Sequence, residues 1–300
     1  MKLPFTYAHL QPYAFGGTTS ATTFDDADVV LLPIPLDRTT SYVPGTRYAP
    51  REILQASTQT ELWDEELEAD LSAVTLATLP EMELPYADQM RSIAEIERVA
   101  HEILARGKFL IALGGEHSIT PPLVKASAAR YSGLSVLQID AHADLRESYL
   151  GSRHSHACAM RRSLEFARCT QVGVRSISQA EATAVPGLPT TIFYDTTMRR
   201  DPAWIDRVVE SLAERVYITI DCDGLDPAVM PAVGTPEPGG LSWHELLAVL
   251  RATFARRKVV GADIVELCPI PGMVAPNMVV ARLVYKLIGY RTYRDRLAGR

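Results

Sequence analysis

The chain has 300 residues, of which 47% are hydrophobic and 22% charged, and its formal net charge is −6 at pH 7. These proportions are typical of folded globular proteins, so they exclude an intrinsically disordered chain and give no reason to invoke a membrane. The acidic balance disfavours nucleic acid as a partner, because a nucleic-acid-binding face is basic, and it permits a cationic substrate.

Apolar runs rich in Val, Ile and Leu recur along the chain and alternate with helical patterns. The runs span residues 28–35, 73–79, 109–113, 134–139, 172–174, 191–194, 216–220 and 259–264. The helical patterns span residues 87–106, 121–131, 203–213, 243–255 and 277–288. Continuous apolar strands separated by helices are typical of a parallel sheet covered on both faces. The sequence therefore predicts a doubly wound α/β fold with about eight strands.

Turn and linker signals predict one domain over residues 1–300. Ser242 and Glu245 form a capping box, which fixes the start of the helix after the Pro- and Gly-rich segment 236–240. No internal repeat occurs, and the nearest candidate for a linker, residues 186–189, is too short to separate two domains.

Several features favour the cytoplasm as the compartment. Residues 1–11 contain one lysine, no apolar core and no small-residue cleavage site, so they do not predict a signal peptide. The longest apolar runs have the length of strands and are too short to span a bilayer. No C-x-x-C pair occurs, which predicts buried thiols rather than a zinc knuckle or a disulfide framework. The cysteines are Cys158, Cys169, Cys222 and Cys268.

The run 134–139 leads directly into Asp140, His142 and Asp144. Alternate side chains of an extended segment share a face, and open α/β sheets place their sites at the C-terminal edge of the strands. One such aspartate alone would be typical of a solvated loop that caps a helix. Three ligand-type side chains at this spacing favour a binding site instead.

A second acidic cluster follows the run 216–220, where Asp221 and Asp223 are again two residues apart. Carboxylates this crowded repel one another unless they are protonated or neutralised by cations, so the two clusters predict a divalent metal site. Asp226 precedes Pro227 and is more typical of a turn than of a ligand.

The run 109–113 leads into Gly114-Gly115-Glu116-His117-Ser118, which places His117 just past two glycines. A strand, glycines and a helix would also fit a phosphate loop, but the spacing matches neither of the common nucleotide-binding motifs. A single histidine at a strand end is usually structural. We interpret His117 as a ligand because the two acidic clusters need a nitrogen donor nearby.

Together the three strand ends supply four carboxylates and two imidazoles, more than one ion needs. These residues are His117, Asp140, His142, Asp144, Asp221 and Asp223. Oxygen-rich ligation with some imidazole favours manganese, with iron, cobalt, nickel and zinc as weaker alternatives, over a thiolate zinc site.

Five segments resemble the signature blocks of the ureohydrolases, the family that includes arginase, agmatinase and guanidinobutyrase. The segments are GGEHS, DAHAD, SHACAMRR, DCDGLDPAVMP and GADIVELCP, and the earlier SYVPGTRYAPREI resembles the family's N-terminal loop. They keep the family's order and spacing and cover nearly the whole chain. Among the family members, the agmatinases are the most similar.

The resemblance implies a three-layer α/β/α fold around an eight-stranded parallel sheet, with two manganese ions per subunit. It implies that one ion is held by His117, Asp140, Asp144 and Asp221, and the other by His142, Asp140, Asp221 and Asp223. Asp140 and Asp221 would then bridge both ions. Two ions about 3.5–4 Å apart can share a water, lower its pKa and present hydroxide to the guanidinium carbon at neutral pH.

The resemblance also assigns two catalytic residues. His156 matches the family's catalytic histidine, which can carry a proton to the leaving amine. His154 is its rival, two residues away, and we expect it at the surface. Glu266 matches the family's guanidinium-binding glutamate, since a carboxylate can take a guanidinium bidentately. Asp263 lies inside the last strand and is expected to be structural.

The stretch after Asp144 bears on the substrate. Arginases hold the amino-acid end of arginine there with Asn and Ser side chains, but residues 145–149 read LRESY and lack that asparagine. Leu145-Arg146 and the later MRR resemble agmatinases, so we expect hydrolysis of agmatine to putrescine and urea. The alternatives are guanidinobutyrate, whose carboxylate Arg146 would meet, and aminopropylagmatine.

The sequence disfavours two other functions. A metal-binding but inactive regulatory relative is disfavoured because every expected ligand, His156 and Glu266 are present. An amidohydrolase of the related deacetylase type, with one zinc ion, is disfavoured by the two full acidic clusters. Ureohydrolases usually form trimers or hexamers, and the resemblance implies a homo-trimer or homo-hexamer here.

Overall fold

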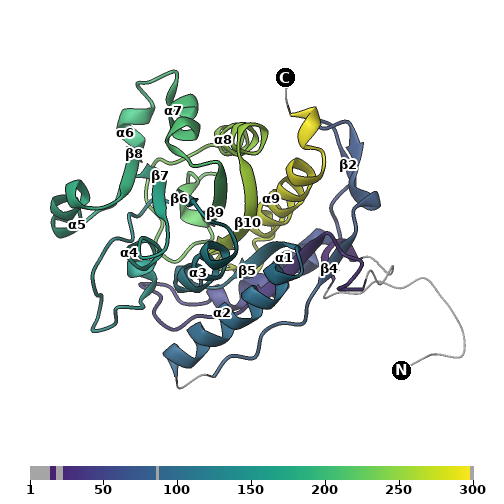
Figure 1. Cartoon of the computed structure of the whole chain (residues 1–300), viewed down its shortest axis with the longest axis horizontal. Helices are drawn as coiled ribbons and strands as arrows, with labels where there is room; N and C mark the ends of the chain where they lie inside the picture. The colour runs from purple at the N-terminus through teal and green to yellow at the C-terminus, as the bar shows by residue number, and fades with distance from the viewer. Residues whose placement is uncertain (1–13, 18–22, 86–87, 298–300) are drawn as a thin grey trace, which may run out of the picture.

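The protein, analysed as a computed structural model, is built on an eight-stranded sheet and is described over residues 14–17, 23–85 and 88–297 (Figure 1). Every strand pair in the sheet is parallel, in the order β4-β1-β5-β10-β9-β6-β7-β8. The strands are β1 (Val29–Ile34), β4 (Leu76–Thr78), β5 (Phe109–Gly114), β6 (Leu134–Ile139), β7 (Arg168–Val174), β8 (Thr190–Tyr194), β9 (Arg215–Asp221) and β10 (Lys258–Val265). The predicted parallel sheet is confirmed.

Helices cover both faces of this sheet. They are α1 (Ala49–Ser57), α2 (Gln89–Ala105), α3 (Thr120–Arg130), α4 (Ala159–Ser163), α5 (Gln179–Ala184), α6 (Asp195–Met198), α7 (Trp204–Ser211), α8 (Trp243–Arg256) and α9 (Ala275–Thr292). A short antiparallel pair, β2 (Trp63–Asp64) and β3 (Ala69–Asp70), lies outside the sheet.

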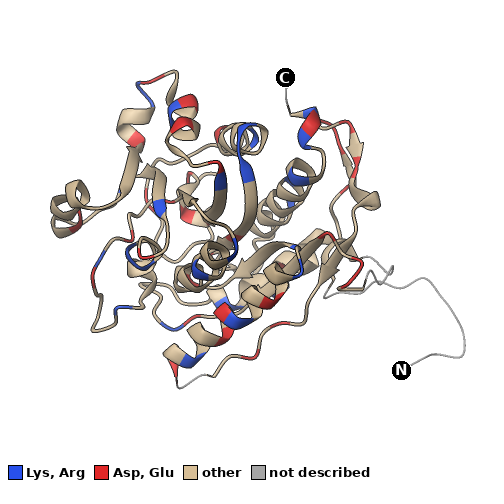
Figure 2. Cartoon of the chain, in the orientation of Figure 1, with Lys and Arg blue, Asp and Glu red and all other residues tan. Residues whose placement is uncertain are grey.

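Two buried clusters form because alternate strand residues point to opposite faces. In β5, Ile111 and Leu113 join the cluster that includes side chains of α1, α8 and α9. Their neighbours Leu110 and Ala112 join the cluster that includes side chains of α2 and α3. Positions of charged residues are frequent on the outer helices, whereas the strands are mostly uncharged (Figure 2). The fold is therefore three-layered, α/β/α.

Some local predictions are confirmed and others need correction. The capping box of α8 is present, since Ser242 Oγ accepts from Glu245 N–H at 3.2 Å and Glu245 accepts from Ser242 N–H at 2.8 Å. The segment SYVPGTRYAPREI is not all loop, because α1 begins at Ala49 with Pro50 in its first turn, where a missing N–H costs nothing. The predicted strand 73–79 shortens to β4, preceded by a 3₁₀ turn at Leu71–Ala73.

The four cysteines are buried and free, as predicted. None of the described helices is long and apolar enough to cross a membrane. Residues 1–11, where no signal peptide was predicted, lie outside the described part of the chain.

Candidate active site

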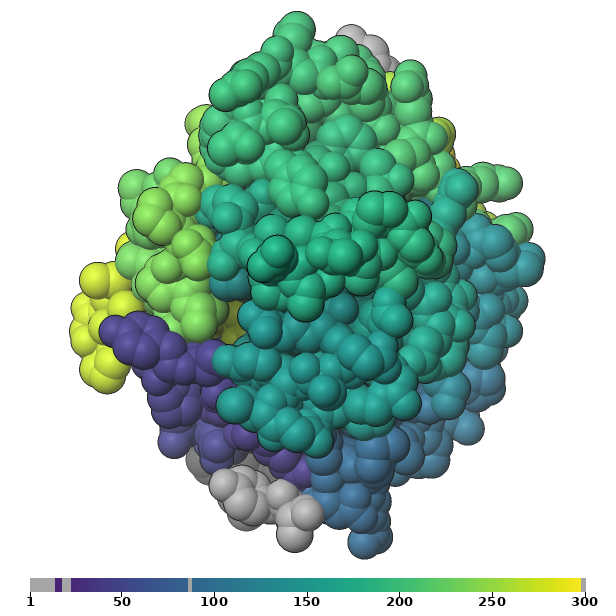
Figure 3. Space-filling view, turned by 90° about the vertical axis from the view of Figure 1, so that its left-hand side faces the viewer, coloured from purple at the N-terminus to yellow at the C-terminus, as the bar shows by residue number. Residues whose placement is uncertain are grey.

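Four neighbouring strands, β5, β10, β9 and β6, end at the same edge of the sheet and carry the predicted site residues. The chain passes from β5 to β6, while β9 and β10 later fill the two positions between them. The C-terminal ends of parallel strands at such a change of direction are where open α/β sheets place ligands. Figure 3 shows purple, teal and light-green segments, far apart in the sequence, meeting on one face.

The first ligand group surrounds His117. Its Nδ1 lies 3.2 Å from Asp140 Oδ2, 3.1 Å from Asp144 Oδ2 and 3.3 Å from Asp221 Oδ2. This nitrogen is buried and forms no hydrogen bond with the described residues. A buried nitrogen that faces three carboxylate oxygens without a hydrogen bond suits a shared divalent cation, which accepts imidazole and carboxylate ligands together.

The second group adjoins the first through Asp140. His142 Nδ1 lies 3.0 Å from Asp223 Oδ2 and 3.6 Å from Asp140 Oδ1, and these three residues could hold a second cation. Asp221 Oδ1 accepts the Asp223 N–H at 2.9 Å. The sharing of Asp140 between the groups agrees with its predicted bridging position, and the bridging role of Asp221 stays a prediction.

Burial and neighbouring negative charges raise the pKa of three of these aspartates. Burial raises the pKa of Asp221 well above its usual range, and the charges of Asp223 and Asp140 raise it further. Burial likewise raises the pKa of Asp223 and of Asp144, with the charge of Asp140 acting in the same direction. Divalent cations would relieve this repulsion, so the donor set fits bound metal.

The carboxylate neighbours also raise the pKa of both histidines, although burial alone would lower it. Burial alone lowers the pKa of His142, but the charge of Asp223 and the contacts with Asp140 raise it to about 12. Burial also opposes ionisation of His117, and its three carboxylate neighbours still raise its pKa well above the usual range. The surroundings of both imidazoles thus favour a positive charge. Either a protonated ring or a metal ion bound to the neutral ring would supply that charge.

Close backbone approaches hold the strand ends in place. A Cβ on Gly115 would lie 1.9 Å from the Leu36 carbonyl oxygen, and a Cβ on Gly224 would lie 2.8 Å from the Asp140 nitrogen. Asp144 and Glu266 have φ of 51° and 63°, which non-glycine residues adopt at an energetic cost. Strained backbone at two site residues is typical of functional sites.

Behind His117, a buried polar group fixes its ring. His117 Nε2 lies 3.0 Å from Thr219 Oγ1, which donates to Asp263 Oδ1 at 2.6 Å. Asp263 also accepts from Tyr217 Oη at 2.8 Å and is fully buried. Asp263 therefore supports the side chain of His117, an expected ligand, from outside the pocket. Asp226 accepts from Ala228 N–H at 2.8 Å within a turn, as predicted.

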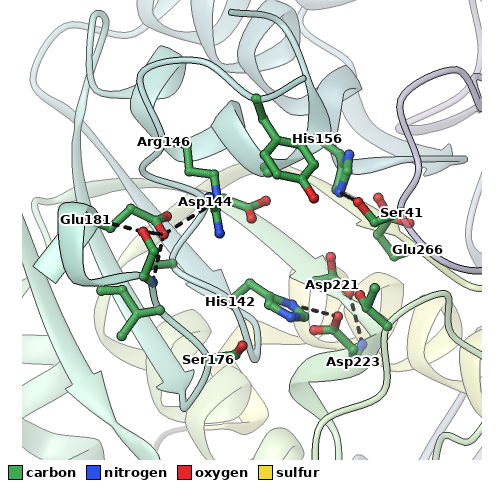
Figure 4. A pocket seen from close by; sticks show the side chains of 16 residues that line it. Ser41, His142, Asp144, Arg146, His156, Ser176, Glu181, Asp221, Asp223 and Glu266 are labelled. Atoms are coloured by element: carbon green, nitrogen blue, oxygen red, sulfur yellow. Dashed lines mark hydrogen bonds and ion pairs between the residues drawn. The ribbon is translucent and has the colours of Figure 1, made fainter. Parts of the chain in front are cut away.

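The ligand groups lie beside a pocket of about 290 Å³ (Figure 4). His156 and Glu266 line it, as do Asp144, Asp221 and Asp223. Glu266 Oε1 accepts the His117 N–H at 2.7 Å. Burial raises the pKa of Glu266 well above its usual range, with the charge of Glu116 adding to the effect. A cation bound against Glu266 would offset both contributions.

His156 is held from two sides. Its Nε2 lies 3.2 Å from Ser41 Oγ, and its Nδ1 lies 3.4 Å from Thr39 Oγ1 and 3.3 Å from Ser155 Oγ. The Tyr149 ring meets the imidazole edge to face at 6.0 Å. His154 lines a different pocket, beside Met90 and Pro122, and is half-buried rather than fully exposed.

Arg146 lines the site pocket, but its guanidinium already has partners. It lies 4.9 Å from the centroid of the Tyr149 ring, and its Nε is 3.7 Å from Glu181 Oε2. Glu181 in turn caps α5 through Ser178. The substrate-binding role of Arg146 stays a prediction.

The sequence did not predict the roles of Thr39 and Ser41, which contact His156, or of Glu116, which contacts Thr39. Thr39 and Ser41 lie more than a hundred positions from His156, so no local spacing relates them. The only signal in the sequence was the SYVPGTRYAPREI segment, which begins at Ser41, two residues after Thr39.

Comparisons with known proteins agree with this geometry. The sequence profile of the Arginase family matches residues 27–289. The chain is 40% identical over 287 residues to N(1)-aminopropylagmatine ureohydrolase of Synechocystis sp., covering 93% of this chain and 94% of that protein. It is 35% identical to agmatinase of Bacillus anthracis over 252 residues, covering 82% and 86%.

Solved structures show the same fold. Agmatine ureohydrolase of Thermoplasma volcanium superposes with a TM-score of 0.86 at 32% identity, covering 97% of each chain. Arginase from Bacillus caldovelox superposes with a TM-score of 0.75 at 22% identity, covering 88% of this chain and 98% of that one, a likeness of fold alone.

Proposed function

Because this chain belongs to the arginase family, a family of ureohydrolases, we propose that it uses two manganese ions to release urea from a cationic guanidino alkylamine. The observation that carries this proposal is the pair of imidazole and carboxylate groups that share Asp140 beside the pocket. Hard oxygen and imidazole donors favour manganese over a thiolate-preferring ion. The names of the two relatives described above, N(1)-aminopropylagmatine ureohydrolase and agmatinase, refer to guanidino substrates.

The proposed ligands are His117, Asp140, Asp144 and Asp221 for one ion and His142, Asp140, Asp221 and Asp223 for the other. When bound, the two ions would lower the pKa of a shared water and supply hydroxide at neutral pH. The carboxylates would hold the ions, and Asp144 Oδ2 already lies 3.1 Å from His117 Nδ1, toward the first ligand group.

Glu266 binds and orients the substrate in this proposal. Its side chain lies at the pocket, and its Oε1 is fixed by the His117 N–H at 2.7 Å. A guanidinium is planar and donates pairs of N–H groups, which a carboxylate accepts with charge assistance. In this proposal, the guanidinium carbon lies near the carboxylates of Asp221 and Asp223, which line the same pocket.

His156 moves the proton that the reaction requires. Cleavage of the C–N bond leaves an amine that must be protonated, and an imidazole can donate that proton near neutral pH. His156 lines the pocket and is half-buried, so its ring reaches both the site and solvent. Arg146 is retained as a proposed contact for the carboxylate of guanidinobutyrate, the alternative substrate, because its guanidinium would repel the ammonium end of agmatine.

Two substrates are proposed. Agmatine, which would give putrescine and urea, follows from the residues after Asp144, and proteins named agmatinase are 35–36% identical. N(1)-aminopropylagmatine is favoured by a separate observation, since three relatives with 38–40% identity are named for it. Either product would be a polyamine.

The test is urea release by the manganese-loaded protein from agmatine, aminopropylagmatine, guanidinobutyrate and L-arginine. We expect both agmatine compounds to exceed arginine in kcat/KM, because an unpaired, desolvated charged group costs several kcal/mol. Parity with arginine would show that the segment 145–149 was misinterpreted. No urea from any of the four would favour an inactive regulatory relative.

We also propose that the enzyme is a cytoplasmic homo-trimer or homo-hexamer. The support is the resemblance to its family. Light scattering during size-exclusion chromatography measures the mass directly, and a 33.0 kDa monomer would contradict the oligomer.

A further inference from the structure

Glu116 is a fully buried carboxylate that belongs to neither ligand group. Its Oε2 accepts the backbone N–H groups of Arg38 and Thr39 at 2.6 and 2.5 Å. Its Oε1 accepts the hydroxyls of Thr39 and Ser118 at 2.8 and 2.5 Å. A carboxylate this deep is stable only with such donors, and here three of the four come from the loop that follows β1.

Thr39 connects this carboxylate to His156. Its Oγ1 donates to Glu116 Oε1 at 2.8 Å and accepts the His156 backbone N–H at 2.9 Å. The same oxygen lies 3.4 Å from His156 Nδ1, and two residues further along the loop Ser41 Oγ lies 3.2 Å from Nε2. The loop fixed by Glu116 therefore contacts both the backbone and both ring nitrogens of the histidine.

We propose that Glu116 and Thr39 are positioning residues that hold the His156 imidazole at the wall of the pocket. Glu116 fixes the start of the loop through its hydrogen bonds, and Thr39 in that loop holds His156 in place. The inference rests on the proposed proton-transfer role of His156. It adds to the site two residues that neither line the pocket nor belong to the ligand groups, although Glu116 directly precedes His117 in the chain.

Ordinary loop anchoring is the competing explanation, and Asp37 is its natural comparison. Asp37 is also a buried carboxylate on this loop, and it accepts from Thr40 Oγ1 at 3.0 Å, Gly45 N–H at 2.9 Å and Arg47 Nε at 3.2 Å. No hydrogen bond joins Asp37 to His156 among the described residues. If loop anchoring alone mattered, loss of either carboxylate would have the same effect.

The first experiment is a double-mutant cycle with Thr39→Val and His156→Ala. In the wild-type background, Thr39→Val should lower kcat roughly ten- to hundredfold with little change in KM, as expected for a misplaced catalytic group. In the His156→Ala background it should change kcat less than about twofold, because the group it positions is gone. Thr39→Ser keeps the hydroxyl and should restore most of kcat.

Equal falls in both backgrounds would overturn the inference, as would an unchanged kcat in Thr39→Val. Glu116→Gln keeps one oxygen for the two backbone N–H donors but turns an amide NH₂ toward the hydroxyls of Thr39 and Ser118, which now donate to the carboxylate. It should therefore show the same dependence on His156. Asp37→Asn is the matched control, and an equal fall in kcat there would overturn the inference in favour of loop anchoring. Circular dichroism on each variant excludes misfolding as the cause.

A second measurement needs no activity. The His156 side-chain NMR signals, assigned with His156→Ala, should shift in Thr39→Val and Glu116→Gln but not in Asp37→Asn, in protein without substrate. Unshifted signals would overturn the positioning role even in an active enzyme. If no guanidino compound yields urea, the proposed function fails, while these signals still decide whether Glu116 and Thr39 hold the ring.

Discussion

Glu266→Gln and Asp221→Asn make the same chemical change at two walls of the pocket and should fail for different reasons. In the proposed function, Glu266 binds the substrate guanidinium and Asp221 binds the metal ions. Glutamine keeps an oxygen that can accept the His117 N–H, now made at 2.7 Å, so the first ligand group should stay in place. Glu266→Gln is therefore expected to retain two metal equivalents.

The size of its kinetic effect follows from burial. Glu266 is 8% exposed, so its contact with a guanidinium would be poorly screened by water. Losing the charge of one partner in such a bidentate contact should cost about 2–4 kcal/mol of transition-state stabilisation. That corresponds to a fall of roughly 30- to 900-fold in kcat/KM.

Asp221→Asn should instead lose metal. Its Oδ2 lies 3.3 Å from His117 Nδ1, so this carboxylate is part of the first ligand group. An amide is a weaker ligand and leaves the cations less neutralised, so excess manganese should not restore the normal rate. Inductively coupled plasma mass spectrometry and urea kinetics on the same two preparations give the comparison. Metal-depleted Glu266→Gln, or fully loaded and active Asp221→Asn, would refute the assignment.

Three further predictions concern metal content and stability. Chelation should abolish urea release, and manganese should restore it at two equivalents per chain; full activity with one tightly bound zinc would contradict the binuclear site. Gly115→Ala should lower the free energy of unfolding by more than about 3 kcal/mol, because the new Cβ would lie 1.9 Å from the Leu36 carbonyl oxygen. Gly187→Ala is the control: its Cβ would meet nothing within 4 Å, so it should lower the free energy of unfolding by less than about 1 kcal/mol. Lys286 Nζ lies 2.9 Å from the fully buried Asp64, and Lys286→Met leaves that carboxylate without its cation. The free energy of unfolding, measured by urea denaturation, should fall by about 3–5 kcal/mol. An unchanged midpoint would show that the pair contributes nothing.

The sequence by itself predicted most of the elements and a set of candidate ligands. Buried parallel strands are continuous apolar runs, so the pattern at 216–220 predicted the strand that became β9. Ligands such as Asp140 and Asp144 lie within five residues of one another, and a strand end fixes their shared side. Short helices such as α1 and α4 were missed, because too few residues repeat to make a helical period visible.

Only the tertiary structure decided which distant residues meet. Strand order places β9 and β10 between β5 and β6, and that order brings Asp221 to His117 and Glu266 to the same pocket. Thr39 meets His156 across 117 positions, so neither periodicity nor spacing could have related them. Such contacts depend on how separate loops pack at one sheet edge, which no local preference of the chain specifies.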